Sequence, residues 1–192
     1  MSRALGDFEY KNVDGKGPTE QLVSPEPEFY IKERQPDLDQ FLVLACDGVW
    51  DVMTNEDICN FICHRLKVHD NLETICNEVI DTCLYKGSRD NMSIIIIAFP
   101  ACPTVDPAAV KLENELNDLL EKKVTELITS HDNDVELSYV HKFLADEDIP
   151  NLPPGGGLAA KKVFIEDVYK KLLPERYETT VSWKLYNHDE DL

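Results

Sequence analysis

The sequence has few basic residues and no long apolar run. It carries 19 lysines and arginines against 37 aspartates and glutamates, so its 192 residues have a formal net charge of −18. Such an acidic surface repels nucleic acids and anionic membranes, and we expect neither as a partner. No apolar stretch approaches the ~20 residues that a membrane-spanning helix requires, and the polar start is unlike a secretory signal. These features predict a cytoplasmic or nuclear protein without a membrane span.

The six cysteines lack the spacing of a disulfide framework. Cys76 and Cys83 recur with apolar residues at helical spacing, which predicts that they lie on the buried stripe of an amphipathic helix. Cys59, Cys63 and His64 invite a zinc interpretation, but no second CxxC or HxxxH pair stands nearby to complete four ligands. We therefore expect ordinary core packing there.

Two apolar runs of strand length lie in the first half of the chain. Residues 40–46 (QFLVLAC) and 92–99 (MSIIIIAF) are continuous runs, which predict strands buried on both faces. Between them, residues 54–57 and 70–73 resemble capping boxes, each beginning a helix. Residues 1–20 are polar and indicate a helix end that leads into an exposed loop.

From about residue 105 the pattern becomes helical throughout. Pro107 follows Asp106 and begins a long helix. Its apolar stripe consists of Ala109, Leu112, Leu116, Leu119, Leu120, Val124, Leu127 and Ile128. A second helix is predicted near residues 137–144, before a linker rich in proline and glycine at residues 149–157.

A third helix is predicted from the spacing of Val163, Ile165, Val168, Tyr169 and Leu172. We therefore expect an all-helical domain at residues 105–174. An acidic tail follows at residues 175–192.

Two aspartates stand next to the predicted strands. Asp47 directly follows the first apolar run, and Asp90 lies in the polar turn before the second. A carboxylate held on rigid backbone at the edge of a sheet suits a hard cation, which prefers oxygen ligands. If the two strands are neighbours, these acids would meet in a metal site. The alternative is that each is an ordinary strand-end or turn residue, as most aspartates are.

Four short sequence motifs favour the metal site. SRALGDF, LVSPEPE, LACDGVWD and KGSRDNMS resemble, in this order, the carboxyl-terminal half of the metal-dependent protein phosphatase 2C family. The helical segments and IPNLPPGGGLA resemble the extra three-helix domain of its animal alpha and beta members, so the resemblance covers roughly residues 2–174. It implies an α+β fold, with part of a β-sandwich and its flanking helices in residues 1–104 and the helical domain in residues 105–174.

The resemblance implies a serine/threonine phosphatase whose complete site holds two Mn²⁺ or Mg²⁺ ions. A metal-bridging water would attack the phosphorus of a phosphoserine or phosphothreonine protein directly, without a covalent phosphoenzyme. Asp47 and Asp90 match metal ligands, and Asp51 matches an acid near a further, weak metal position.

Other matched residues border the family's substrate channel. Arg3 matches the end of a helix, and Asp7 and Lys16 lie in the segment that matches the flap. For Arg3, the alternative is a solvated surface arginine. Arg89 would pair with an acid near the metals or, as the alternative, is likewise solvated.

The sequence also departs from the family pattern. A complete member carries, upstream of the matched half, a Glu-Asp pair, a metal-binding segment of the type DGHGG and an arginine that holds the substrate phosphate, and this sequence has no counterpart of that upstream part. The nearest word, DGKG at residues 14–17, has lysine in place of histidine. We therefore expect a truncated or partial chain that binds metal weakly, has little activity alone, and exposes strand edges and apolar faces.

Two other functional classes compete with this interpretation. The chain would be a non-catalytic binding or regulatory fragment if protein partners dock on the helical domain at residues 105–174. A calcium loop beginning at Asp132 is excluded by spacing, because its sixth position is Leu137 instead of glycine and its twelfth is Phe143 instead of glutamate.

Overall fold

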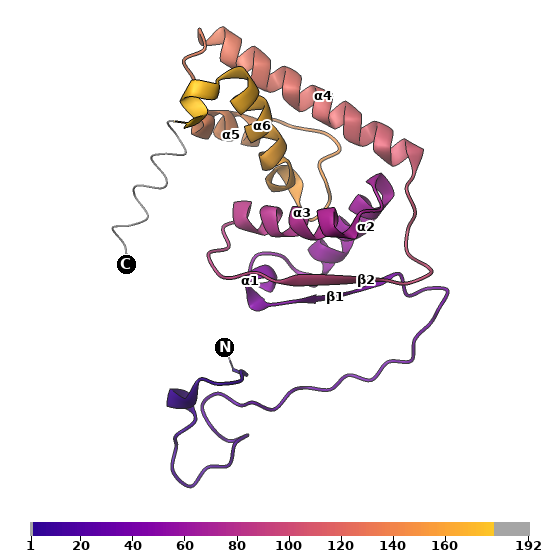
Figure 1. Cartoon of the computed structure of the whole chain (residues 1–192), viewed down its shortest axis with the longest axis vertical. Helices are drawn as coiled ribbons and strands as arrows, with labels where there is room; N and C mark the ends of the chain where they lie inside the picture. Colours follow the sequence, from indigo (N-terminus) through magenta and orange to yellow (C-terminus); the bar gives the residue numbers. More distant parts are fainter. Residues whose placement is uncertain (1, 179–192) are drawn as a thin grey trace. The chain divides into compact units, whose positions relative to one another are not determined.

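The structure is a computed structural model that describes residues 2–178, so residues 179–192 of the predicted acidic tail lie outside it. The chain divides into two compact units, residues 1–35 and 36–192. Figure 1 shows the elements along the chain. They are η1 (Phe8–Tyr10), β1 (Phe41–Ala45), α1 (Asp47–Trp50), α2 (Asn55–Val68), α3 (Leu72–Tyr85), β2 (Ile94–Ala98), α4 (Pro107–Ser130), α5 (Leu137–Ala145), η2 (Gly157–Lys161) and α6 (Lys162–Leu172).

The first unit is mostly irregular. Arg3 and Ser24 form an isolated parallel bridge, and the backbone N–H of Ala4 donates to the carbonyl of Ser24 at 3.1 Å. The predicted helix end at the start of the chain is therefore wrong, because these residues are extended and bond across the unit. Val23 is buried here, whereas most other large apolar side chains, such as Phe29 and Tyr30, lie on the surface.

The second unit begins with a two-stranded antiparallel sheet in which β1 pairs with β2 and Val43 faces Ile96. Both strands lie within their predicted ranges. One face of the sheet packs on α2 and α3. The prediction of burial on both faces is wrong, because the other face is between 42% and 60% exposed. Its side chains are Leu42, Leu44, Ile95 and Ile97.

Helices α2 and α3 begin at side-chain caps. The predicted capping box of α2 is confirmed, since Asp57 N–H donates to Thr54 Oγ1 at 3.1 Å and Thr54 N–H donates to Asp57 Oδ2 at 3.2 Å. The box predicted for α3 at residues 70–73 is wrong by one position. Asn71 caps this helix instead, because its Oδ1 accepts from Thr74 N–H at 3.1 Å and asparagine is as strong a cap as aspartate.

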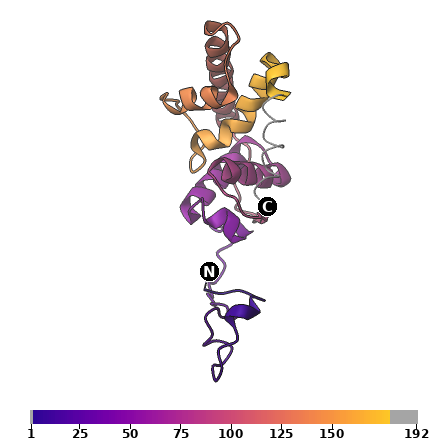
Figure 2. The ribbon, with the colours of Figure 1, turned by 90° about the vertical axis from the view of Figure 1, so that its left-hand side faces the viewer.

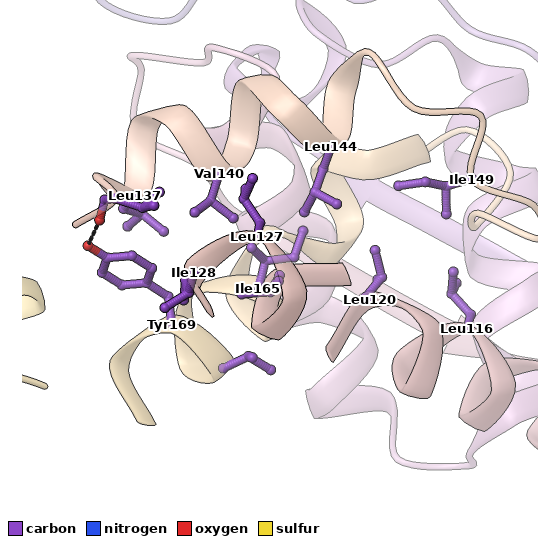
Figure 3. Close-up of a cluster of buried hydrophobic side chains, with 13 residues drawn as sticks. Leu116, Leu120, Leu127, Ile128, Leu137, Val140, Leu144, Ile149, Ile165 and Tyr169 are labelled. Atoms are coloured by element: carbon purple, nitrogen blue, oxygen red, sulfur yellow. Dashed lines mark hydrogen bonds between the residues drawn. The ribbon is translucent and has the colours of Figure 1, made fainter. Parts of the chain in front are cut away.

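Helices α4, α5 and α6 confirm the three helices predicted after residue 105. Asp106 caps α4 and Pro107 occupies its first turn, as predicted. Their apolar faces meet in one buried cluster, in which the Tyr169 hydroxyl donates to the Val135 carbonyl at 2.7 Å (Figure 3). Leu112 was predicted in the buried stripe but is 46% exposed, because the buried cluster along α4 starts only at Leu116.

The predicted linker at residues 149–157 is a packed contact. Pro153 and Gly156 are buried. A Cβ on Gly155, whose φ is +72°, would overlap the carbonyl of Asp57 at the start of α2. A Cβ on Gly156 would lie 2.9 Å from the ring of Phe61. Glycine is therefore required at both positions by the close approach of this loop to α2.

In the second unit, α2 and α3 lie between the sheet and helices α4–α6, as the views of Figures 1 and 2 agree. The α+β class and the helical carboxyl-terminal region are confirmed, while the only sheet among residues 2–178 has two strands. The domain boundaries at residues 104 and 174 stay predictions. Within the described part of the chain, we find no helix both long and apolar enough to cross a bilayer.

Candidate metal centre

The pairing of β1 with β2 brings the two predicted metal-binding segments to one edge of the sheet. Ala45, the last residue of β1, faces Ile94, the first residue of β2. Asp47 follows β1 by two residues and is the first residue of α1. Asp90 precedes β2 by four residues. An antiparallel pairing places both carboxylate-bearing turns at the same end of the two strands.

Hydrogen bonds fasten these two turns together. Cys46 N–H donates to the Ser93 carbonyl at 3.2 Å, and the Cys46 thiol donates to the Asn91 carbonyl at 3.2 Å. Ser88 Oγ donates to the Gly48 carbonyl at 2.7 Å. The hydrogen bonds from Ser93 to the Cys46 sulfur lower the pKa of this thiol. The backbone on either side of Asp47 is therefore bonded directly to residues 88–93, which contain Asp90.

Gly48 allows this close approach. A Cβ at this position would lie 2.5 Å from the carbonyl oxygen of Asn91 and 3.0 Å from Met92 Cγ, so any side chain would push the two turns apart. Trp50 fixes the other side of α1, because its indole N–H donates to the Ala45 carbonyl at 2.8 Å and its ring packs against the apolar cluster below the sheet. Trp50 thus packs the turn against the cluster.

The acidic side chains around this edge differ in exposure. Asp47 is half-buried, whereas Asp51 and Asp90 are exposed, and Asp90 Oδ1 accepts from the N–H of Asn91 at 2.7 Å. Within residues 2–178, no group of three or more histidine, cysteine, aspartate or glutamate side chains is placed to hold a metal ion. The described residues therefore offer oxygen donors of the right chemistry but only part of the cage that Mg²⁺ or Mn²⁺ needs. The roles of these aspartates stay predictions.

The predicted channel residues lie in the first unit. Arg3 forms an ion pair with Glu28, with Nη1 2.5 Å from Oε1, and its hydrogen bond lowers the pKa of the glutamate. Asp7 precedes η1 with φ at 49°, a left-handed conformation. Lys16 is exposed, and its carbonyl accepts from Gln21 Nε2 at 2.9 Å. Arg3 is thus engaged with an acid, while the roles of all three at a substrate channel stay predictions.

Sequence reasoning missed a buried ionic cluster formed by side chains of α2, α3, α4 and η2. Glu113 Oε1 accepts from Arg65 Nη1 at 2.7 Å and from Lys161 Nζ at 2.5 Å. Arg65 also forms two parallel hydrogen bonds to the carboxylate of Glu78, at 2.7 and 2.8 Å. Burial raises the pKa of Glu113, but the bonds from Lys161 and Arg65 outweigh it and lower this pKa overall. Burial lowers the pKa of Lys161.

Comparison with known proteins gives a family match for the first half of the chain and another for the helical part. Residues 1–92 match the family described as protein phosphatase 2C, and residues 93–170 match the protein serine/threonine phosphatase 2C, C-terminal domain. Protein phosphatase 1A of Homo sapiens is 58% identical over 183 residues, which are 95% of this chain and 48% of that protein. Protein phosphatase 1B of Mus musculus is 54% identical over 178 residues, which are 92% of this chain and 45% of that protein. The chain spans about half the length of these curated relatives.

Proposed function

The chain belongs to the protein phosphatase 2C family, and from this premise we propose that it forms part of a metal-dependent protein serine/threonine phosphatase. The substrates in this proposal are phosphoserine and phosphothreonine residues of proteins. The observation that carries it is the juxtaposition of the turns bearing Asp47 and Asp90 at one edge of the β1–β2 sheet. A cytoplasmic or nuclear location stays a prediction of the sequence alone.

We propose that this chain supplies only some of the oxygen ligands of the metal site. Asp47 and Asp90 would each contribute carboxylate oxygen to Mn²⁺ or Mg²⁺, and Asp51 would face a weaker position. Residues outside this sequence would supply the remaining ligands, because the described acids make only part of a cage. Such an ion, when bound, lowers the pKa of its water and offsets charge that builds on phosphoryl oxygens. The chain's own part is to hold the two carboxylates on backbone that Gly48 and Ser88 lock together.

A chimera tests this proposal. The part of Homo sapiens Protein phosphatase 1A outside the matched region would be fused to this chain, and Mn²⁺-dependent phosphate release from a phosphothreonine peptide would be measured. We expect the chimera to be active and the 192-residue chain alone to be nearly inactive. Asp47→Asn and Asp90→Asn should each lower kcat by about a hundred-fold or more, since each removes charge from the groups that hold the metal.

Asp118→Asn is the matched control for these variants, because Asp118 is an exposed acid on α4 and its change removes the same charge. It should keep the activity of the chimera. A folded chimera whose activity is unaffected by Asp47→Asn and Asp90→Asn would contradict the assigned roles. A folded chimera without any activity would contradict the proposed reaction.

The second candidate is a binding or regulatory fragment that acts through its helical part. One observation favours it: the cluster formed by α4, α5 and α6 is a hydrophobic core of its own. Circular dichroism of residues 105–178 would show a cooperative thermal transition if this part folds alone. A gradual, non-cooperative loss of helical signal would count against an independent module.

A further inference from the structure

Ser24 is the only serine or threonine in the sequence that stands directly before a proline. The chain has 11 prolines, and apart from Pro25 none of them follows a serine or threonine. A serine followed by proline is the element that proline-directed protein kinases recognise, because their clefts accept a residue without a backbone N–H after the phosphorylated one. A kinase of this class therefore has one target hydroxyl in this chain.

The Ser24 hydroxyl is available for reaction. Its oxygen accepts from Glu26 N–H at 3.1 Å, whereas its own proton is donated to no acceptor in the part of the chain that the structure describes. Ser24 is partly exposed, and every residue at positions 25–38 is exposed. Pro25 also disfavours helical backbone at Ser24, so this residue is already close to the extended form in which a kinase cleft binds its substrate.

Little structure holds this segment in place. Ser24 N–H donates to the Ser2 carbonyl and Ala4 N–H donates to the Ser24 carbonyl, both at 3.1 Å, and these two bonds form an isolated bridge. The neighbouring Val23 is buried but belongs to neither hydrophobic cluster. A single bridge with few apolar contacts opens locally at a much smaller free-energy cost than a strand inside a sheet. The segment can therefore enter a kinase cleft by local opening of the first unit.

A cation stands opposite the hydroxyl. Arg3 faces Ser24 in the bridge, and facing residues of paired extended segments carry their side chains on the same side, with Cβ atoms roughly 5 Å apart. Arg3 Nη1 lies 2.5 Å from Glu28 Oε1, and its other side-chain N–H groups have no partner among residues 2–178. A phosphate on Ser24 would bring three acceptor oxygens and almost two negative charges to these unused donors.

We propose that Ser24 is a phosphorylation site for a proline-directed serine/threonine kinase, and that Arg3 binds the phosphate. The kinase transfers the γ-phosphoryl group of ATP: a bond forms between Ser24 Oγ and the γ-phosphorus, the bond from this phosphorus to the leaving ADP breaks, and the hydroxyl proton passes to the base of the kinase. Arg3 then turns from Glu28 to the phosphate, because a dianion with three acceptors forms stronger hydrogen bonds than one carboxylate oxygen. The proposal does not rest on the phosphatase reaction, since it involves none of the metal ligands.

Incubation of the full 192-residue chain with ATP and a mitogen-activated protein kinase, followed by peptide mass spectrometry, tests the site. We expect one phosphate per chain, on Ser24. Pro25→Ala should slow its incorporation by about ten-fold or more, because it removes the recognition element. Pro27→Ala is the matched control, since it removes the other proline of the same segment, and it should change the rate by less than about two-fold.

Three results of this experiment would overturn the proposal. They are the absence of phosphate on Ser24, equal slowing by Pro25→Ala and Pro27→Ala, and phosphorylation of a peptide of residues 17–32 but not of the folded chain. The last result would mean that the bridge keeps Ser24 out of reach.

Titration of the phosphorylated chain by ³¹P NMR tests the contact with Arg3. A neighbouring guanidinium favours the dianion, so the second pKa of the phosphate should be lower in the parent chain than in Arg3→Gln, by about half a pH unit for a partly exposed pair. Lys16→Gln removes the same charge from an exposed loop of the same unit and should leave this pKa unchanged. Identical values in the parent and Arg3→Gln, or an equal rise in both variants, would refute the binding of the phosphate by Arg3.

Discussion

Glu113→Ala is the substitution whose effect on folding stability the structure predicts most sharply. Glu113 Oε1 is the shared acceptor of Arg65 and Lys161, and all three residues are less than 10% exposed. Removing one partner of a buried ion pair costs about 3–5 kcal/mol, because the charge left behind stays desolvated. Arg65 keeps its two bonds to Glu78, whereas Lys161 keeps only Asn117, a neutral acceptor. We therefore expect a loss near the lower end, about 3 kcal/mol.

The assay is urea and thermal denaturation of the full chain, followed by circular dichroism. A loss of about 3 kcal/mol lowers Tm by roughly 6–12 °C in a unit of this size. Glu126→Ala serves as the control, since Glu126 pairs with Lys122 at 3.8 Å on the exposed face of α4, and it should cost less than about 0.5 kcal/mol.

A third variant separates charge from packing. Arg65→Met/Glu113→Leu/Lys161→Met removes all three buried charges together, so it should recover most of the stability lost in Glu113→Ala. If Glu113→Ala were no more destabilising than Glu126→Ala, the reasoning about an uncompensated buried lysine would be refuted.

Three further predictions concern the loop, acid stability and a thiol. Gly155→Ala should lower the free energy of unfolding by about 2–4 kcal/mol in chemical denaturation, because the added Cβ overlaps the Asp57 carbonyl at a φ of +72°. Gly157→Ala is the control, since its φ of +56° is also positive but its Cβ meets open space, and it should cost only about 1 kcal/mol. Equal costs would show that the contact with α2 is absent. The pKa of Glu113 is lowered in the folded chain, so its contribution to stability is present above its unfolded pKa of 4.5 and is lost as the pH falls through the folded value. Glu113→Gln should therefore flatten the acid side of a Tm-against-pH curve, and a curve parallel to the parent's would disprove this linkage. Burial raises the pKa of Cys83 to about 11, so iodoacetamide at pH 8 should modify the exposed Cys59 and spare Cys83 in the folded chain, as peptide mass spectrometry would show; equal labelling of both would contradict the burial of Cys83.

The elements with strong local signals were predictable from the sequence. Asp106 and Pro107 mark the start of α4, and Thr54 with Asp57 marks the start of α2, because a cap depends only on residues two or three positions apart. The two strands followed from their apolar runs. The prediction of burial on both faces failed, because an apolar run does not show whether a second layer covers the sheet. Leu42 and Ile95 on the uncovered face are exposed.

The candidate site was predictable only in part. Asp47 and Asp90 were expected to meet if their strands were neighbours, and the β1–β2 register brings their turns together. The cluster of Arg65, Glu113 and Lys161 had no comparable signal. Arg65 and Lys161 each lie 48 residues from Glu113 along the chain, and charged residues on amphipathic helices usually indicate a solvated face. Only the docking of α4 onto α2 and of η2 onto α3 shows that these charges are buried.

The contact of Gly155 with Asp57 also bears on the order in which the chain folds. Apart from Ala160, the residues of one hydrophobic cluster lie within residues 41–102, and those of the other lie within residues 116–177. The Gly155–Asp57 contact instead closes a loop of 98 residues (155 − 57 = 98). Because loop closure is disfavoured until the joined surfaces exist, we expect both clusters to condense first and the glycine loop to dock last. The Gly155→Ala variant, which strains this contact, should then unfold faster and fold at almost the same rate as the parent chain.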